Sequence, residues 1–516
     1  MSDLAFLVGH ASVAFQIRCV GPTLPINAVI AADAAWHVLH STALSAPRRR
    51  DHFRVRFRRQ TLHAIVKTVI LSFMSATPSF TFPFLSISDP EQSGEGARND
   101  PLGLASTGEV LADWLLPGLT SRMIRPRFLT AIAVSAAVCD GFGDEPAADR
   151  ITPAYLVFEW LAVSGMAHHK QSEETLRTPG IEKVRTAIEN KVPLGNRNYL
   201  KTPSVFGYHG VYKRLARHLS IANDDLNLDE NGRKLLQTWE TEQKCDGFSD
   251  AAFATGANQF RKLQTEVRMG LKDGAVNCSR NWVGWNFFGA NLSPGRVGKA
   301  EASYIWDLLV THPNGETRGE IFRLMDQEVG RELRNTEGWN ELQAALKFLP
   351  LGSLELQKRL NVILAYEAIA TKLDEAFAWL QFLGMQRRGL PVTRMEFATR
   401  SEVRQITAET PKLLATASTE IKQAPPNAIE RLNDIANYFD RVTNAEELFE
   451  ALWSRHEAVQ LAKQPPKGKL TWIVRDGDGV RVRPKFFLDE PPSQQLRWGR
   501  PYRLKTVFSF WQDLKG

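Results

Sequence analysis

The sequence predicts a mainly α-helical, multi-helical protein with a small C-terminal β-hairpin appendage. Apolar residues recur with a helical period over most of residues 100–465, and the period changes to that of a strand near residue 470. Hydrophobic content of 43% and charged content of 23% are typical of soluble globular chains. Cysteines lie far apart without a CxxC pair, which argues against zinc and disulfide frameworks and suits a reducing cytoplasm. They are Cys19, Cys139, Cys245 and Cys278.

Residues 1–73 form a basic, acid-poor segment, and the first glutamate of the chain is Glu91. The segment holds nine Lys+Arg and three Asp, a net charge of 9 − 3 = +6, so the other residues sum to 55 − 54 = +1. Three interpretations are open: a cleaved targeting peptide, a phosphate-binding arm, or translated upstream sequence before Met74. We favour the third interpretation, in which residues 1–73 are upstream sequence. It predicts that N-terminal mass spectrometry of the native protein will not find Met1.

An N-terminal helical domain is predicted for residues 74–200. Val110, Leu111, Trp114 and Leu115 recur at helical spacing, and Pro117-Gly118 ends that helix. Further apolar helices are expected at about residues 125–138 and 153–167.

Residues 201–245 are compatible with part of a winged helix. Val211 and Leu215 lie on one face of a helix, with Arg214 and Arg217 on the other, and a short strand signal at 226–228 precedes a second helix. The alternative, which we favour, is that these are plain helices of a larger domain.

Residues 246–345 contain a basic loop with tryptophans. Between Arg261 and Lys299 the chain has seven Lys+Arg and two acids. Basic side chains attract phosphates and aromatic rings stack on bases. The alternative is that the tryptophans are core and the charges a solvated rim. If the protein binds DNA, the expected residues are Arg214, Arg217, Arg280, Trp282, Trp285, Arg296 and Lys299.

A helical bundle is predicted for residues 346–465, followed by a β appendage at 466–516. Residues 353–384 carry a long apolar stripe, and Gly384 suits a C-cap. Thr443 with Glu446 fits a capping box, and His456 is expected on a helix surface. Strands at 470–474 and 480–483 flank a Gly-containing loop. The last segment, 501–514, is expected to pack down as a strand or helix.

Motifs of phosphate-binding loops, serine hydrolases and zinc proteases are missing from the sequence. We therefore expect no cofactor and no metal, and a protein that is not an enzyme. The alternative is a metal-dependent nuclease whose carboxylates are dispersed along the chain.

Three short segments carry a family resemblance: Asp100-Pro-Leu-Gly-Leu104, Leu111-Ala-Asp-Trp-Leu-Leu-Pro-Gly-Leu-Thr120 and Arg125-Pro-Arg-Phe128. They resemble the N-terminal signature of an uncharacterised bacterial family encoded beside phage-defence genes, including helicases and phospholipase-D-like nucleases. The resemblance implies a cytoplasmic protein of a defence locus. It supplies no catalytic residue.

The expected function is a non-enzymatic nucleic-acid-associated or scaffold component of a bacterial anti-phage defence system. The expected partners are DNA and a helicase or nuclease encoded nearby, with no membrane. A pure protein-interaction subunit is a further alternative.

Overall fold

The computed structural model describes residues 100–516 apart from 144–145, 170–176, 250–254, 464–467 and 493–498. The basic segment 1–73 lies outside the described residues. The described part is mainly helical with small antiparallel sheets, as the periodicity predicted. None of its helices combines the length and the apolar character that crossing a membrane requires.

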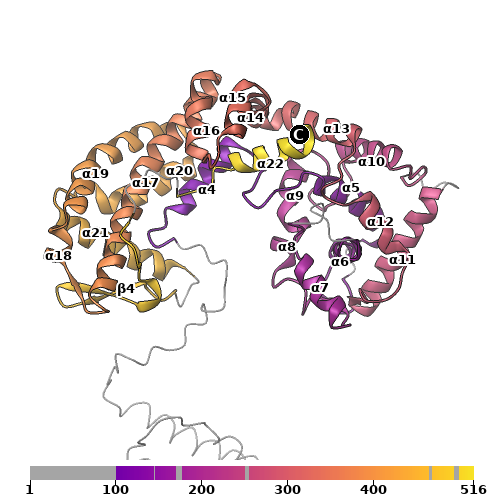
Figure 1. Cartoon of the computed structure of the whole chain (residues 1–516), viewed down its shortest axis with the longest axis horizontal. Helices are drawn as coiled ribbons and strands as arrows, with labels where there is room; N and C mark the ends of the chain where they lie inside the picture. Colours follow the sequence, from indigo (N-terminus) through magenta and orange to yellow (C-terminus); the bar gives the residue numbers. More distant parts are fainter. Residues whose placement is uncertain (1–99, 144–145, 170–176, 250–254, 464–467, 493–498) are drawn as a thin grey trace, which may run out of the picture. The chain divides into compact units, whose positions relative to one another are not determined.

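Helix α6 is the central element of the first group of helices. Its neighbours in direct contact are α5, α7, α9, α11 and α12, and they surround it in Figure 1. This helix buries side chains around most of its circumference, which suits a central position. The group consists of α5 (Phe128–Cys139), α6 (Ala154–His168), α7 (Ile181–Glu189), α8 (Pro203–Phe206), α9 (Tyr208–His218), α10 (Glu230–Glu242), α11 (Thr255–Asp273), α12 (Gly284–Asn291) and α13 (Lys299–Thr311).

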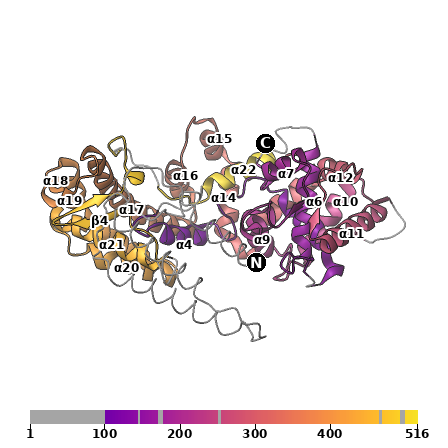
Figure 2. The same ribbon diagram turned by 90° about the horizontal axis from the view of Figure 1, so that it is seen from below.

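A second group packs around the long helix α17 (Leu354–Gln386). Figure 2 shows it beside the helices that follow it in the chain. The apolar stripe predicted for it is buried: Leu356, Leu360, Ile363, Leu373, Phe377 and Leu380. The other members are α18 (Arg394–Ala398), α19 (Ser401–Glu420), α20 (Pro426–Phe439) and α21 (Ala445–Ala462).

Short helices and the two ends of the described chain connect these groups. Helix α4 contacts α17 and α20, whereas the C-terminal helix α22 contacts α13, α14 and α16 (Figure 1). The connecting elements are α4 (Ala105–Leu115), α14 (Glu316–Asp326), α15 (Glu328–Asn335), α16 (Glu341–Phe348) and α22 (Leu504–Lys515). Residues 93–516 form one compact unit, so the domain boundaries expected inside it stay predictions.

The strands are short and antiparallel. β4 (Ile473–Asp476) pairs with β5 (Gly479–Val482), and β5 also pairs with β3 (Val392–Thr393), about 90 residues earlier. A second sheet joins β1 (Leu194–Gly195) to β2 (Ala275–Val276). The β region of the tail is thus completed by a strand from the helical part of the chain.

Two details of the helix ends differ from expectation. Gly384 lies inside α17, whose C-cap is Arg387. A Cβ on Gly384 would be 2.4 Å from Cγ2 of Val482 on β5, so the close contact with this strand favours glycine there. Helix α21 is capped by Asn444, whose Oδ1 accepts from the Glu447 main-chain N–H at 2.9 Å. The Glu447 carboxylate in turn accepts from Thr443, so the cap is displaced by one residue from the predicted pair.

His456 also differs from its predicted position on a helix surface. It is fully buried, with Nδ1 2.9 Å from the Pro101 carbonyl oxygen and Nε2 2.8 Å from the Trp472 main-chain nitrogen. Segments that are distant in sequence cover this face of α21, which the local pattern could not reveal.

Candidate nucleic-acid interface

Helix α11 has one buried face and one basic, exposed face. Leu263, Val267 and Gly270 are buried, and a Cβ on Gly270 would be 2.5 Å from Val157 of α6. The exposed face carries Arg261, Lys262, Thr265, Arg268 and Lys272. Positions 261, 265, 268 and 272 recur every three or four residues and therefore form one stripe.

The exposed cations of α11 lack acidic partners in the described part of the chain. Arg261 donates from Nη2 to Asn258 Oδ1 at 2.8 Å, and the Arg268 guanidinium lies 5.4 Å from the centre of the Phe142 ring. Glu266, on the same helix, pairs instead with Arg280. The four cations Arg261, Lys262, Arg268 and Lys272 therefore present their charge to solvent. We call these four residues the α11 basic face.

The sequence-predicted residues Arg280, Trp282 and Trp285 are brought together near α12. The Arg280 guanidinium lies 5.1 Å from the centre of the Trp282 ring and 6.0 Å from that of Trp285. The two indole rings meet edge to face at 4.7 Å. Val283, between them in sequence, is 83% exposed.

Trp285 is a core residue and is only 4% exposed. Its Nε1 donates to the Arg280 carbonyl oxygen at 3.0 Å, and its ring stacks on His168 at 5.3 Å. Trp282 is half-buried against it. Trp285 thus has no face available for a base, whereas Trp282 keeps partial exposure.

Arg214 and Arg217 both lie on α9, and each has an acidic neighbour. Arg214 Nη2 is 2.5 Å from Asp113 Oδ2 of α4. Arg217 Nε is 3.6 Å from Asp224 Oδ1, and its Nη2 also donates to the Asp224 carbonyl oxygen. These pairs neutralise part of the charge that a phosphate would need.

Arg296 and Lys299 are exposed at the beginning of α13. Helix α13 receives its N-terminal cap from Glu242 of α10, which accepts from the main-chain N–H groups of Ala300 and Glu301 at 3.0 Å. The seven predicted residues thus lie on three parts of the chain: α9, the segment 280–285 that leads into α12, and the beginning of α13.

The sequence prediction left the α11 basic face out of its list of expected site residues. Its signal was present in the spacing of Arg261, Arg268 and Lys272, because all three fall on one helical face. Counting basic residues over the whole loop concealed this periodicity.

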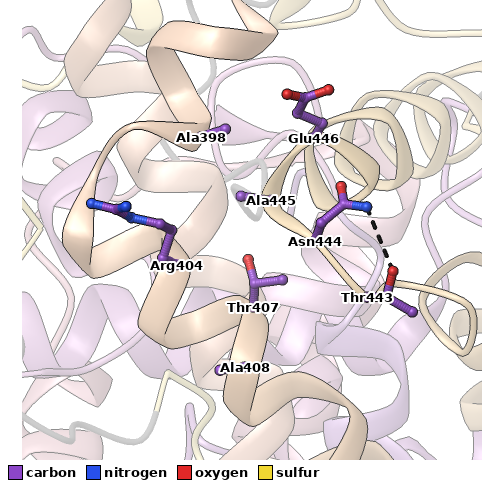
Figure 3. A pocket seen from close by; sticks show the side chains of 8 residues that line it. All are labelled: Ala398, Arg404, Thr407, Ala408, Thr443, Asn444, Ala445 and Glu446. Carbon is purple, nitrogen blue, oxygen red and sulfur yellow. Dashed lines mark hydrogen bonds between the residues drawn. The ribbon is translucent and has the colours of Figure 1, made fainter.

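One open surface hollow offers little chemistry. An open hollow of about 460 Å³ lies between α18, α19 and the beginning of α21 (Figure 3). Thr443 and Asn444 line it, and both are occupied in capping α21. Arg404 is the cation labelled at its edge, and it donates to the Thr399 carbonyl oxygen.

Among the residues that the structure describes, no three His, Cys, Asp or Glu side chains converge as metal ligands. Cys139, Cys245 and Cys278 are free thiols, and burial raises the pKa of Cys139 to about 12. No family model, curated protein or solved structure matches this chain.

Proposed function

We propose that the protein is a nucleic-acid-associated component that binds the phosphate backbone through the α11 basic face. The observation that supports this most directly is a stripe of exposed cations without carboxylate partners in the described part of the chain. From Arg261 to Lys272 it extends about 16 Å along the helix. On one strand of a duplex, that length corresponds to roughly five phosphates.

The mode of binding that follows is electrostatic and independent of sequence. Each cation that neutralises a phosphate releases counterions, so affinity falls as salt rises. Trp282 is half-buried with the Arg280 guanidinium over its ring, and Arg280 pairs with Glu266, so this indole is not used as a stacking surface in the proposal. Trp285 has no part in this proposal because it is buried.

The winged-helix interpretation of residues 201–245 remains a weaker proposal. Its support is the order α9, an antiparallel bridge between Ala222 and Leu228, then α10. Because Arg214 and Arg217 have acidic neighbours, we assign this segment a secondary role. The bacterial defence role and a helicase or nuclease partner rest on the sequence resemblance alone, whereas the cytoplasmic location rests on the resemblance and on the scattered cysteines.

The test compares the full-length protein with the triple variant Arg261→Gln, Arg268→Gln, Lys272→Gln in binding to a labelled DNA duplex over a range of salt concentrations. We expect the slope of log affinity against log salt to become shallower by about 2 to 3, because each lost phosphate contact contributes about 0.9. Both proteins contain the basic segment 1–73, so its contribution to the salt dependence is the same in each and does not affect the difference between their slopes.

A matched control removes the same charge elsewhere. Lys412, Lys422 and Arg431 are exposed on α19, the following turn and α20, and each is changed to Gln. This control should keep the wild-type slope. If both triple variants lose affinity equally, or neither does, the α11 basic face is not the binding surface.

A further inference from the structure

A small cavity of about 140 Å³ lies where α5, α6 and α9 meet. Ser135 and Cys139 of α5 form one wall, and Tyr155 and His209 stand at the beginnings of α6 and α9. Residues 225–227 complete the lining. None of these groups has a part in the phosphate binding proposed above.

His209 faces this cavity as half of a buried pair with Glu159. The Glu159 carboxylate accepts from the Tyr199 hydroxyl at 2.8 Å, and from the main-chain N–H and Nδ1 of His209 at 2.9 and 3.0 Å. A carboxylate only accepts, so Nδ1 carries a proton that it donates to Glu159. His209 is 1% exposed, and its Nε2 has no partner in the described structure.

The cavity combines acceptors with donors. Helix α6 begins without a side-chain cap, and the main-chain N–H groups of Ala154 and Tyr155 have no acceptor in the described part of the chain. Asp225 and Asn227, both exposed, also line the cavity. The positive end of α6 disfavours a cation, and Asp225 disfavours an anion. A neutral ligand with both donors and acceptors satisfies this lining.

The volume of the cavity and the Tyr155 ring that lines it restrict the class of ligand further. Pockets for drug-sized ligands take about 300–1,000 Å³, so this cavity suits a single ring. Tyr155 is half-buried, and its ring centre lies 5.2 Å from that of His209. We propose that the cavity binds a nucleobase, a pyrimidine in particular, stacked on Tyr155 and hydrogen-bonded to His209 Nε2.

The base has two sources, a free nucleoside or a base turned out of a nucleic acid. The cavity adjoins the α11 basic face through residues 138–143: Gln264 of α11 donates to the Val138 carbonyl oxygen at 3.4 Å, and Arg268 lies over Phe142. Gly143 itself lines the cavity. A strand held by α11 could therefore supply the base. This second source rests on the proposed function, whereas the first does not.

The first experiment titrates the full-length protein with cytidine, uridine and adenosine, using ribose as the control without a base, and follows binding by saturation-transfer NMR and calorimetry. We expect the pyrimidine nucleosides to bind and ribose not to bind. Tyr155→Ala should weaken binding about fivefold or more, because stacking is lost. Tyr155→Phe should bind within about twofold of wild type, because it keeps the stacking face.

Tyr438→Ala, at a half-buried tyrosine on α20, is the matched control and should leave nucleoside binding unchanged. No binding of any nucleoside to the wild type, or equal binding by Tyr155→Ala, would overturn the proposal.

The second experiment distinguishes the two sources with single-stranded oligonucleotides that are intact or contain abasic sites. If bases enter from a strand, the wild type prefers the intact oligonucleotide and Tyr155→Ala loses that preference without a change of salt dependence. If only free nucleosides bind, the wild type shows no preference for the intact oligonucleotide. The proposal that a base enters from a nucleic-acid strand is then wrong. A triple α11 variant that still binds nucleosides would show that the cavity functions without the α11 basic face.

Discussion

At the scale of single residues, the segments that carry the family resemblance hold the fold together. Asp100 accepts from the main-chain N–H groups of Leu104 and Ala105 and so begins α4. Arg125 pairs with Asp513 at 2.5 Å, and Arg127 forms a buried pair with Glu301 at 3.1 Å. These roles are structural.

The same scale gives a prediction at Gly207, before α9. A Cβ there would lie 1.9 Å from Glu159 Oε1. Gly207→Ala should therefore lower the free energy of unfolding by about 2 kcal/mol or more, because the buried carboxylate must leave its hydrogen bonds. Urea unfolding measures this. Gly141→Ala is the control and should change stability little, because Gln264 Nε2 would be 3.9 Å from the added Cβ.

At the scale of elements, helical period predicted where the helices lie, and contacts decided how they end. The stripe of α17 and the apolar faces of α5 and α6 appear as expected. Helix α17 continues past Gly384 to Gln386, so the predicted helix end was wrong while the helix itself was confirmed. Local pattern also carries no information about Val482 of β5, about 100 residues away in the sequence, which leaves no room for a Cβ on Gly384.

Helix α21 gives a prediction for pH. Burial lowers the pKa of His456 from 6.5 to about 4, so the unfolded chain takes up a proton before the folded chain does. The free energy of unfolding should then fall as pH decreases from about 6.5 to 4, by up to ~3 kcal/mol. Urea unfolding of wild type and His456→Gln at several pH values tests this. His456→Gln should be less stable than the wild type at pH 7 and should lack the fall in stability that the histidine causes between pH 6.5 and 4. Parallel plots of the free energy of unfolding against pH for the two proteins would contradict the prediction.

At the scale of the whole described unit, the C-terminal residues connect distant parts of the chain. Tyr502 donates from its main-chain N–H to Glu341 and from its hydroxyl to Glu367 at 2.7 Å. Arg503 reaches Glu109 and Asp113 of α4. The tail therefore packs as a helix preceded by a buried, hydrogen-bonded segment.

Arg500 provides the prediction at this scale. Its guanidinium is buried against Glu367 at 3.3 Å and reaches Asp374 at 2.5 Å. Arg500→Ala should lower the free energy of unfolding by about 3–5 kcal/mol, because the Glu367 carboxylate is left buried without the guanidinium that pairs with it. Arg481→Ala removes an exposed pair with Asp476 and should cost at most about 1 kcal/mol. Chemical unfolding of both variants measures the difference, and equal losses would contradict the structural role of Arg500.

The sequence by itself determined the mainly helical class, the burial of the α17 stripe and the spacing of the α11 basic face. Each follows from a period that neighbouring residues set. Only the tertiary structure decided that Trp285 and His456 are buried, that Arg214 and Arg217 have acidic neighbours, and that Glu159 and His209 meet at a cavity. Those outcomes depend on contacts between residues far apart in the chain, such as Arg500 and Glu367, which are 133 positions apart.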